Sequence, residues 1–182
     1  MDILTAIGLA LPAGLNAYIP LLGLALAQRF GVVALNEPWS AIGDWWVVGL
    51  MSVLLLIEIL ADKFPVVDHA NDVLQSVVRP AAGAVVAVAA SGQAGENYPL
   101  VMVFLGVLLA GSVHAVKASA RPVVNVSTGG TGAPLASAAE DAFAAASTAL
   151  AIFAPVLVLA LVGLFGWGIA RFTQRRRRRA SA

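Results

Sequence analysis

From Ile3 to Ala27 the chain carries no charged side chain, and almost every residue is apolar. A stretch of roughly 20 such residues is what an α-helix needs to cross a bilayer. In the whole chain 60% of the residues are hydrophobic and 12% are charged, whereas a soluble domain has about 25% charged residues. A globule of 182 residues cannot bury so much apolar surface, so the sequence predicts an all-α integral membrane protein.

Five segments are predicted to be transmembrane helices. They are residues 3–27, 45–61, 66–90, 98–120 and 137–172. The first contains Gly14, Asn16 and Pro20, so we expect its middle to be kinked or locally unwound. Trp45 and Trp46 open the second segment, as expected for an aromatic belt at the membrane interface.

The third segment combines a short apolar part with a polar one. The apolar part, residues 81–90, is too short to cross a bilayer alone. The polar part carries a helical stripe at spacings of four, three and four: Asp68, Asp72, Gln75 and Arg79. We expect one crossing helix whose polar stripe faces protein. The alternative is a surface-lying amphipathic helix followed by a short re-entrant segment.

Residues 121–137 are rich in Gly, Ser, Thr and Pro, which predicts a re-entrant or non-helical connection before the last span. Ser137 and Glu140 have the spacing of a capping box that opens the last helix. We expect residues 1–172 to form one polytopic membrane domain and residues 173–182 a basic cytoplasmic tail. Arginines favour the cytoplasmic side, and five spans then place the N-terminus outside.

Charged residues gather at two connections, between the second and third and between the fourth and fifth predicted spans, which lie on one side of the membrane. Intramembrane charges cost about 2.5–3.5 kcal/mol each on insertion scales, so they persist where they pair or line a wet cavity. The predicted substrate- or ion-binding residues are Asn16, Glu58, Asp62, Lys63, Asp68, Asp72, Arg79, His114, Lys117, Arg121, Asn125, Glu140 and Asp141. Alternatively, these charges mark the water interface and lock the helices together.

We therefore expect a transporter or channel for an ion or a small polar solute, in which carboxylates bind a cation or carry a proton. A chain of 182 residues is small for alternating access, which favours a homo-oligomer. One alternative is a membrane enzyme acting on a lipid-linked or phosphorylated substrate, although no catalytic set with matching roles is evident. The other is a structural or partner-binding protein whose arginine tail contacts anionic lipid. A nucleic-acid partner is not expected.

No cofactor motif is evident, and a divalent metal stays an open alternative. Asp68, His69, Asp72 and His114 are candidate ligands by residue type, although no spacing among them is specific for a metal. The chain has no cysteine, which excludes disulfides and thiolate metal sites.

The blocks ADKFPVVDHANDVLQSVVRP, KASARPVVNVSTGG and SAAED, with GLNAYIPLL upstream, occur in this order along the chain. Together they resemble a bacterial integral-membrane family described only as a domain of unknown function. The similarity covers roughly residues 8–145. It implies a compact multi-span protein of the bacterial plasma membrane whose polar motifs matter, and it implies no activity.

Overall fold

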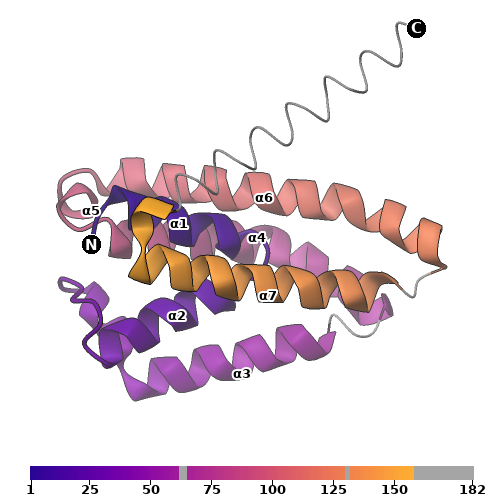
Figure 1. The fold of residues 1–182 in the computed structure, drawn as a ribbon, viewed down its shortest axis with the longest axis horizontal. Coiled ribbons are helices and arrows are strands. Elements are labelled where there is room, and N and C mark those ends of the chain that lie inside the picture. The colour runs from indigo at the N-terminus through magenta and orange to yellow at the C-terminus, as the bar shows by residue number, and fades with distance from the viewer. Residues whose placement is uncertain (62–64, 130–131, 158–182) are drawn as a thin grey trace, which may run out of the picture.

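A computed structural model describes residues 1–61, 65–129 and 132–157, without the side chains of residues 65–72, 125 and 133. The regular structure in these residues is entirely helical (Figure 1). The elements are α1 (Ile3–Ala13), α2 (Tyr18–Arg29), the short 3-10 helix η1 (Trp39–Gly43), α3 (Trp45–Ala61), α4 (Pro65–Ala90), α5 (Gln93–Asn97), α6 (Pro99–Thr128) and α7 (Gly132–Phe153).

Residues 3–27 do not cross the bundle once, as predicted, but turn back on themselves. α1 begins beside the end of α4, where a Cβ atom placed on Gly92 would lie 2.6 Å from the Met1 carbonyl oxygen. α2 ends beside the start of α3, where the Arg29 guanidinium lies 4.7 Å from the centre of the Trp45 ring. Both places are at the same end of the molecule in Figure 1, so α1 and α2 form a re-entrant helical hairpin. The predicted single crossing is wrong, while the predicted break near its middle is confirmed.

The tip of the hairpin, between α1 and α2, lies about halfway along the long helices (Figure 1). Gly14 approaches α6 so closely that a Cβ atom there would be 2.3 Å from the Ala110 carbonyl oxygen. Asn16 Oδ1 accepts hydrogen bonds from the backbone N–H groups of Tyr18 and Ile19 at 3.0 and 3.1 Å, which satisfies the start of α2. The two legs, of 11 and 12 residues, are about 16 and 18 Å long, so neither can cross a hydrocarbon core of about 30 Å.

Three helices are long and apolar enough to cross a membrane, and α1 and α3 are shorter apolar helices. The three candidate spans are Val73–Ala90 in α4, Pro99–Thr128 in α6 and Pro134–Phe153 in α7. Together these helices suggest a multi-pass membrane protein. The predicted bounds of the second and third segments agree with α3 and α4. Because α4 is one continuous helix, the alternative of a surface helix followed by a separate re-entrant segment is wrong.

The connection predicted for residues 121–137 is mostly helical instead. α6 continues through Pro122 to its end, and α7 begins at Gly132. Ser137 therefore lies inside α7 and does not cap it, so the predicted capping box is wrong. The hydroxyls of Ser127 and Thr128 donate to the Val124 carbonyl oxygen of their own helix, so these residues extend α6, and their abundance is a misleading sign of a loop.

The last predicted span, residues 137–172, is interrupted. α7 ends at Phe153, and Ala154 is not helical. Residues 158–172 and the predicted tail lie outside the described part of the chain. Figure 1 shows the end of α3, the start of α4, the end of α6 and the start of α7 at one end of the molecule, and the N-terminus and the end of α7 at the other.

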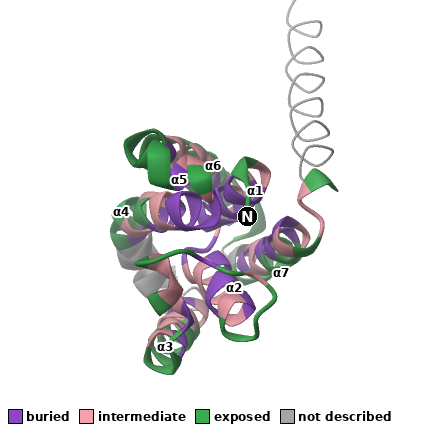
Figure 2. Cartoon of the chain, turned by 90° about the vertical axis from the view of Figure 1, so that its left-hand side faces the viewer, coloured by how far each residue is buried: buried purple, intermediate pink, exposed green. Residues whose placement is uncertain are grey.

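The best-packed part of the molecule surrounds the hairpin. Its buried cluster joins small and medium apolar residues of α1, α2, α4 and α7: Ala6, Leu9, Ala10, Leu24, Val86, Ala87, Ala89, Ala90 and Ala151. α4 and α6 cross closely here. A Cβ atom on Gly106 would lie only 2.3 Å from the Gly83 carbonyl oxygen. In Figure 2, α3 lies at the edge of the bundle and is exposed over most of its surface.

Candidate functional site

The first polar group in the bundle, the central ion pair, consists of Glu58 on α3, Arg79 on α4 and His114 on α6. The two terminal nitrogens of Arg79 each donate a hydrogen bond. Nη2 donates to Glu58 Oε1 at 2.9 Å, and Nη1 donates to His114 Nδ1 at 2.9 Å. Arg79 is fully buried, and the other two are less than 10% exposed. Because a guanidinium only donates, His114 Nδ1 accepts here, and the neutral ring carries its proton on Nε2.

The central ion pair lies deep along the helices. The exposed aromatic side chains Trp45 and Tyr98 mark the end of the bundle where α3 and α6 begin. At 1.5 Å per residue, Glu58 lies about 20 Å along α3, Arg79 about 16 Å before the end of α4, and His114 about 22 Å along α6. If one face of a hydrocarbon core of about 30 Å lies at those aromatic residues, Arg79 falls near its middle and the other two about two thirds of the way across.

The second polar group, the lateral base cluster, joins α6 to α7 through Lys117, Arg121, Ser137 and Glu140. Lys117 Nζ lies 2.8 Å from Glu140 Oε2, and Arg121 reaches the same oxygen at 3.5 Å. Arg121 also donates to the Ser137 hydroxyl at 2.7 Å. Both bases and the serine are buried, whereas the Glu140 side chain is 23% exposed. Two positive charges and one negative charge give these side chains a net charge of +1.

The hairpin tip is held by both α6 and α7. Lys117 Nζ donates to the Leu15 carbonyl oxygen at 2.9 Å. Asn16 Nδ2 donates to Asp141 Oδ1 at 2.9 Å, and Asn16 is almost completely buried. Lys117 therefore contacts both the broken backbone of the hairpin and the carboxylate of Glu140, which connects the tip to the lateral base cluster.

Eight of the predicted site residues make polar contacts, in separate groups. Glu58, Arg79 and His114 form the central ion pair. Lys117, Arg121 and Glu140 belong to the lateral base cluster, and Asn16 pairs with Asp141 at the hairpin tip. Asp62 and Lys63 lie outside the described residues. Asp68, Asp72 and Asn125 lie on α4 and α6, but their side chains are not described, so their place in the site stays a prediction.

The metal candidates are tested only in part. His69, like Asp68 and Asp72, has a side chain outside the description, whereas His114 bonds Arg79. Among the side chains that the structure does describe, no group of three His, Asp or Glu residues is placed to hold a metal ion.

Two contacts of the site are not predicted by the sequence. Ser137 has the spacing of a cap and is a partner of Arg121. The Leu15 carbonyl, which accepts from Lys117, has no side-chain signal at all. A helical stripe on α6, formed by His114, Lys117 and Arg121 at spacings of three and four, was a usable signal that these bases share one face.

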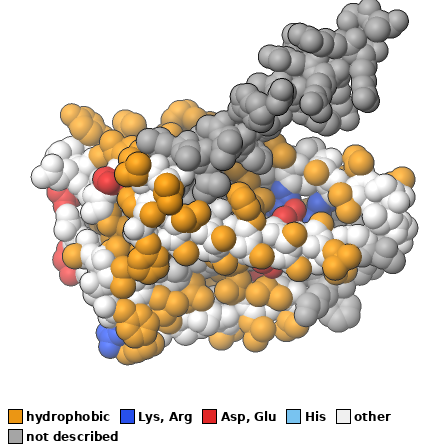
Figure 3. All heavy atoms as spheres, in the orientation of Figure 1, with side chains coloured by type: hydrophobic (Ala, Val, Ile, Leu, Met, Phe, Trp, Pro, Cys, Tyr) orange, Lys and Arg blue, Asp and Glu red, His pale blue; other side chains and the backbone are white. Residues whose placement is uncertain are grey.

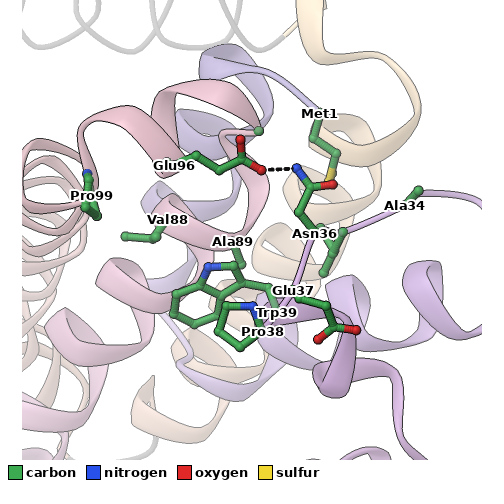
Figure 4. A pocket seen from close by; sticks show the side chains of 13 residues that line it. Met1, Ala34, Asn36, Glu37, Pro38, Trp39, Val88, Ala89, Glu96 and Pro99 are labelled. Atoms are coloured by element: carbon green, nitrogen blue, oxygen red, sulfur yellow. Dashed lines mark hydrogen bonds between the residues drawn. The ribbon is translucent and has the colours of Figure 1, made fainter.

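A separate pocket lies at the opposite end of the molecule (Figure 4). It has a volume of about 260 Å³ and is lined by residues of the α2–α3 connection and of the region around α5, Trp39 and Pro99 among them. Asn36 donates a hydrogen bond to Glu96 across it. The pocket contains none of the predicted site residues.

Comparison with known proteins supplies a family but no activity. Comparisons with curated proteins and with solved structures each found no match. A family model described as a domain of unknown function (DUF4126) matches residues 3–175, which is nearly the whole chain. The resemblance seen in the sequence blocks is thereby confirmed, and the chain belongs to this family of domains of unknown function, DUF4126.

Proposed function

We propose that this protein is a small membrane transporter or channel for an ion or a small polar solute, with its pathway at the hairpin tip. The observation that carries the proposal is that two half-length helices end halfway through the bundle beside buried, paired charges. Broken helices at this depth bring backbone N–H and C=O groups to a place where a substrate can bind.

The contacts of Lys117 support a cation as substrate. Its ammonium lies between the Leu15 carbonyl oxygen and the Glu140 carboxylate, which are the oxygen ligands that hard cations use in proteins. In this proposal the ammonium fills the position when no substrate is bound. An entering cation displaces it, and Glu140 keeps its contact with Arg121.

The central ion pair gives the same pathway a second charged position, deeper in the bundle. The Arg79 guanidinium pairs with Glu58 at 2.9 Å and donates to His114 Nδ1 at 2.9 Å, which joins α3, α4 and α6 at one place. A solute that passes this level would have to exchange these contacts for its own.

The finer topology belongs to the proposal as well. The arginines of residues 173–182 favour the cytoplasm, and the family resemblance favours a bacterial plasma membrane. Because residues 3–29 return to the end where they begin, they no longer count as a crossing, and the side of the N-terminus does not follow from five spans. The homo-oligomer stays a prediction from chain length.

A thermal-shift screen of the detergent-purified protein tests the proposal. The probes are sodium, potassium, ammonium and magnesium salts at matched ionic strength. Any ion that raises the apparent Tm is then tested for protein-dependent flux into liposomes. A ligand at a concentration 100 times its Kd stabilises the native state by about 2.7 kcal/mol, which raises the apparent Tm measurably. We expect one cation to stabilise the parent and the control Glu96→Gln, but not Glu140→Gln.

Two results would oppose the proposal. If no salt shifts the parent while Lys117→Gln and Arg79→Gln only lower its Tm, the buried charges lock the helices and bind no ion. If the stabilising ion shows no protein-dependent flux, the site binds but does not transport.

A further inference from the structure

The lateral base cluster also faces the outer surface of the bundle. Figure 3 shows basic and acidic side-chain atoms together on the face between α6 and α7, surrounded by hydrophobic atoms. Ion pairs of Lys117 and Arg121 with Glu140 join these two helices, and the Glu140 side chain is 23% exposed. The cluster can therefore be reached from the side of the bundle.

The depth of the cluster matches the headgroup region of one leaflet. Counted from the start of α6, Lys117 lies about 27 Å and Arg121 about 33 Å along the helix. The hydrocarbon core is about 30 Å thick, and headgroups extend the bilayer to about 40–45 Å. With the other face of the core at Trp45 and Tyr98, Arg121 lies at the level of lipid phosphates.

The surface around the cluster is apolar. The stretches of α6 and α7 that carry the cluster expose several large hydrophobic side chains: Val116, Val123, Val126, Leu135 and Phe143. In a membrane this surface is covered by lipid chains, so a lipid is the molecule with direct access to the buried bases. A headgroup linked to those chains would enter the cluster from the bilayer.

We propose that Lys117, Arg121 and Ser137 bind the phosphate group of an anionic phospholipid between α6 and α7. Arg and Lys donate charge-assisted hydrogen bonds to phosphate oxygens, and a serine hydroxyl adds a neutral donor. All three side chains are buried and come within hydrogen-bond or ion-pair distance of one another or of Glu140. Glu140 occupies the anion position from inside the protein, and a phosphate competes with it. This inference does not depend on transport.

The experiment measures binding of phosphatidylglycerol and phosphatidylcholine to the full-length protein by native mass spectrometry and by thermal shift in mixed micelles. We expect the parent to prefer phosphatidylglycerol. Arg121→Gln should weaken that binding about tenfold or more, the effect of one charge-assisted hydrogen bond. Glu140→Gln should strengthen it, because it removes the competing carboxylate. Arg29→Gln, which removes the same charge at the other end of the molecule, should leave it unchanged.

The arginine tail is present in every variant, so its attraction to anionic lipid cancels in the comparison. Equal weakening by Arg29→Gln, or equal binding of the two lipids, would overturn the proposal. If inorganic phosphate raises the Tm of the parent as much as phosphatidylglycerol does, the ligand is a free anion and not a lipid. If Arg121→Gln does not fold, the Glu140→Gln variant tests the proposal. Unchanged or weaker binding of phosphatidylglycerol by that variant would contradict competition between the Glu140 carboxylate and the lipid phosphate.

Discussion

The two halves of the bundle are held together differently. In the half that contains the hairpin, helices touch through alanines and glycines, and the Gly83–Gly106 crossing brings two backbones together. Toward the other end, ion pairs of Arg79, Lys117 and Arg121 with carboxylates are among the contacts that join the helices in the described part of the chain. The hairpin reaches only about halfway along the long helices (Figure 1). At its tip Lys117 of α6 bonds the Leu15 carbonyl oxygen and pairs with Glu140 of α7.

This difference follows from the solvent. Lipid chains are as apolar as leucine, so burial alone does not drive membrane helices together, and close packing or polar pairing must do so. Short helices that fill the interior allow close packing. Where they end, polar pairing replaces it, and each charge needs a partner because the surroundings are apolar.

Arg79→Gln should have the largest effect on stability, because it attacks the charged half at its most buried point. The Glu58 carboxylate loses the cation at 2.9 Å, and breaking a buried pair costs about 3–5 kcal/mol. Equilibrium unfolding in mixed micelles measures the change. The double variant Glu58→Gln/Arg79→Gln should recover part of the loss, and Glu96→Gln at the opposite end should stay within about 0.5 kcal/mol of the parent. An Arg79→Gln variant as stable as Glu96→Gln would show that the pair contributes little.

Gly106→Ala tests the hairpin half in the same unfolding assay. The new Cβ would lie 2.3 Å from a backbone oxygen of α4, so the two helices must move apart, at a cost of about 1–3 kcal/mol. Gly49→Ala on α3 is the matched control, since a Cβ there meets nothing within 4 Å. That control should be neutral or more stable by up to about 1 kcal/mol, because alanine favours a helix over glycine. Equal effects at both glycines would contradict close packing of α4 on α6.

Asn16 marks the boundary between the halves, and replacing it should have an intermediate effect. Asn16→Ala removes the acceptor for two α2 N–H groups and the donor to Asp141, for a loss of about 0.5–2 kcal/mol. Asn16→Asp keeps the acceptor but places a carboxylate opposite Asp141. We expect the aspartate variant to unfold more readily than the alanine variant. The reverse order would mean that capping of α2, and not the contact with α7, is what the asparagine provides.

Asp2 at the start of α1 should give the smallest effect, and one that depends on pH. The Thr5 backbone N–H bonds its carboxylate and holds the pKa of Asp2 below the ordinary 3.8. A lowered pKa means that the cap stabilises the fold above pH 3.8 and is lost as the pH falls through the lower folded-state value. The Tm difference between the parent and Asp2→Ala should be constant near neutral pH and shrink in acid. A difference that grows in acid would contradict this assignment.

Hydropathy and residue type predict α3 and α4 well, the end of α6 and the bounds of α7 less well, and the hairpin poorly. The bounds of α3 are the predicted ones, because its apolar run ends in charges on one side and tryptophans on the other. The break at Gly14 and Asn16 was predicted from the same residues. Its geometry was not, because a kinked crossing and a reversed hairpin have the same one-dimensional pattern. Only the contacts of the two ends with Gly92 and Trp45 distinguish them.

Which residues make polar contacts was more predictable than how they pair. A charge such as Glu58 or Arg79 in an apolar helix needs a partner, and the structure gives both residues one, while their role as a binding site stays a prediction. Which base meets which acid depends on helix rotation and crossing, which local sequence does not encode. Ser137 shows the limit clearly, since its spacing to Glu140 fits a cap although both side chains are partners of Arg121.

Cysteine labelling tests the re-entrant hairpin most directly, and the natural absence of cysteine makes it simple. Ile3→Cys, Val32→Cys and Ser127→Cys place single exposed thiols at the start of α1, after α2 and near the end of α6. In sealed, oriented vesicles, an impermeant maleimide should label positions 3 and 32 from the same side and position 127 from the other. Labelling of positions 3 and 32 from opposite sides would show that residues 3–29 cross the membrane once, and would contradict the hairpin on which the site is built.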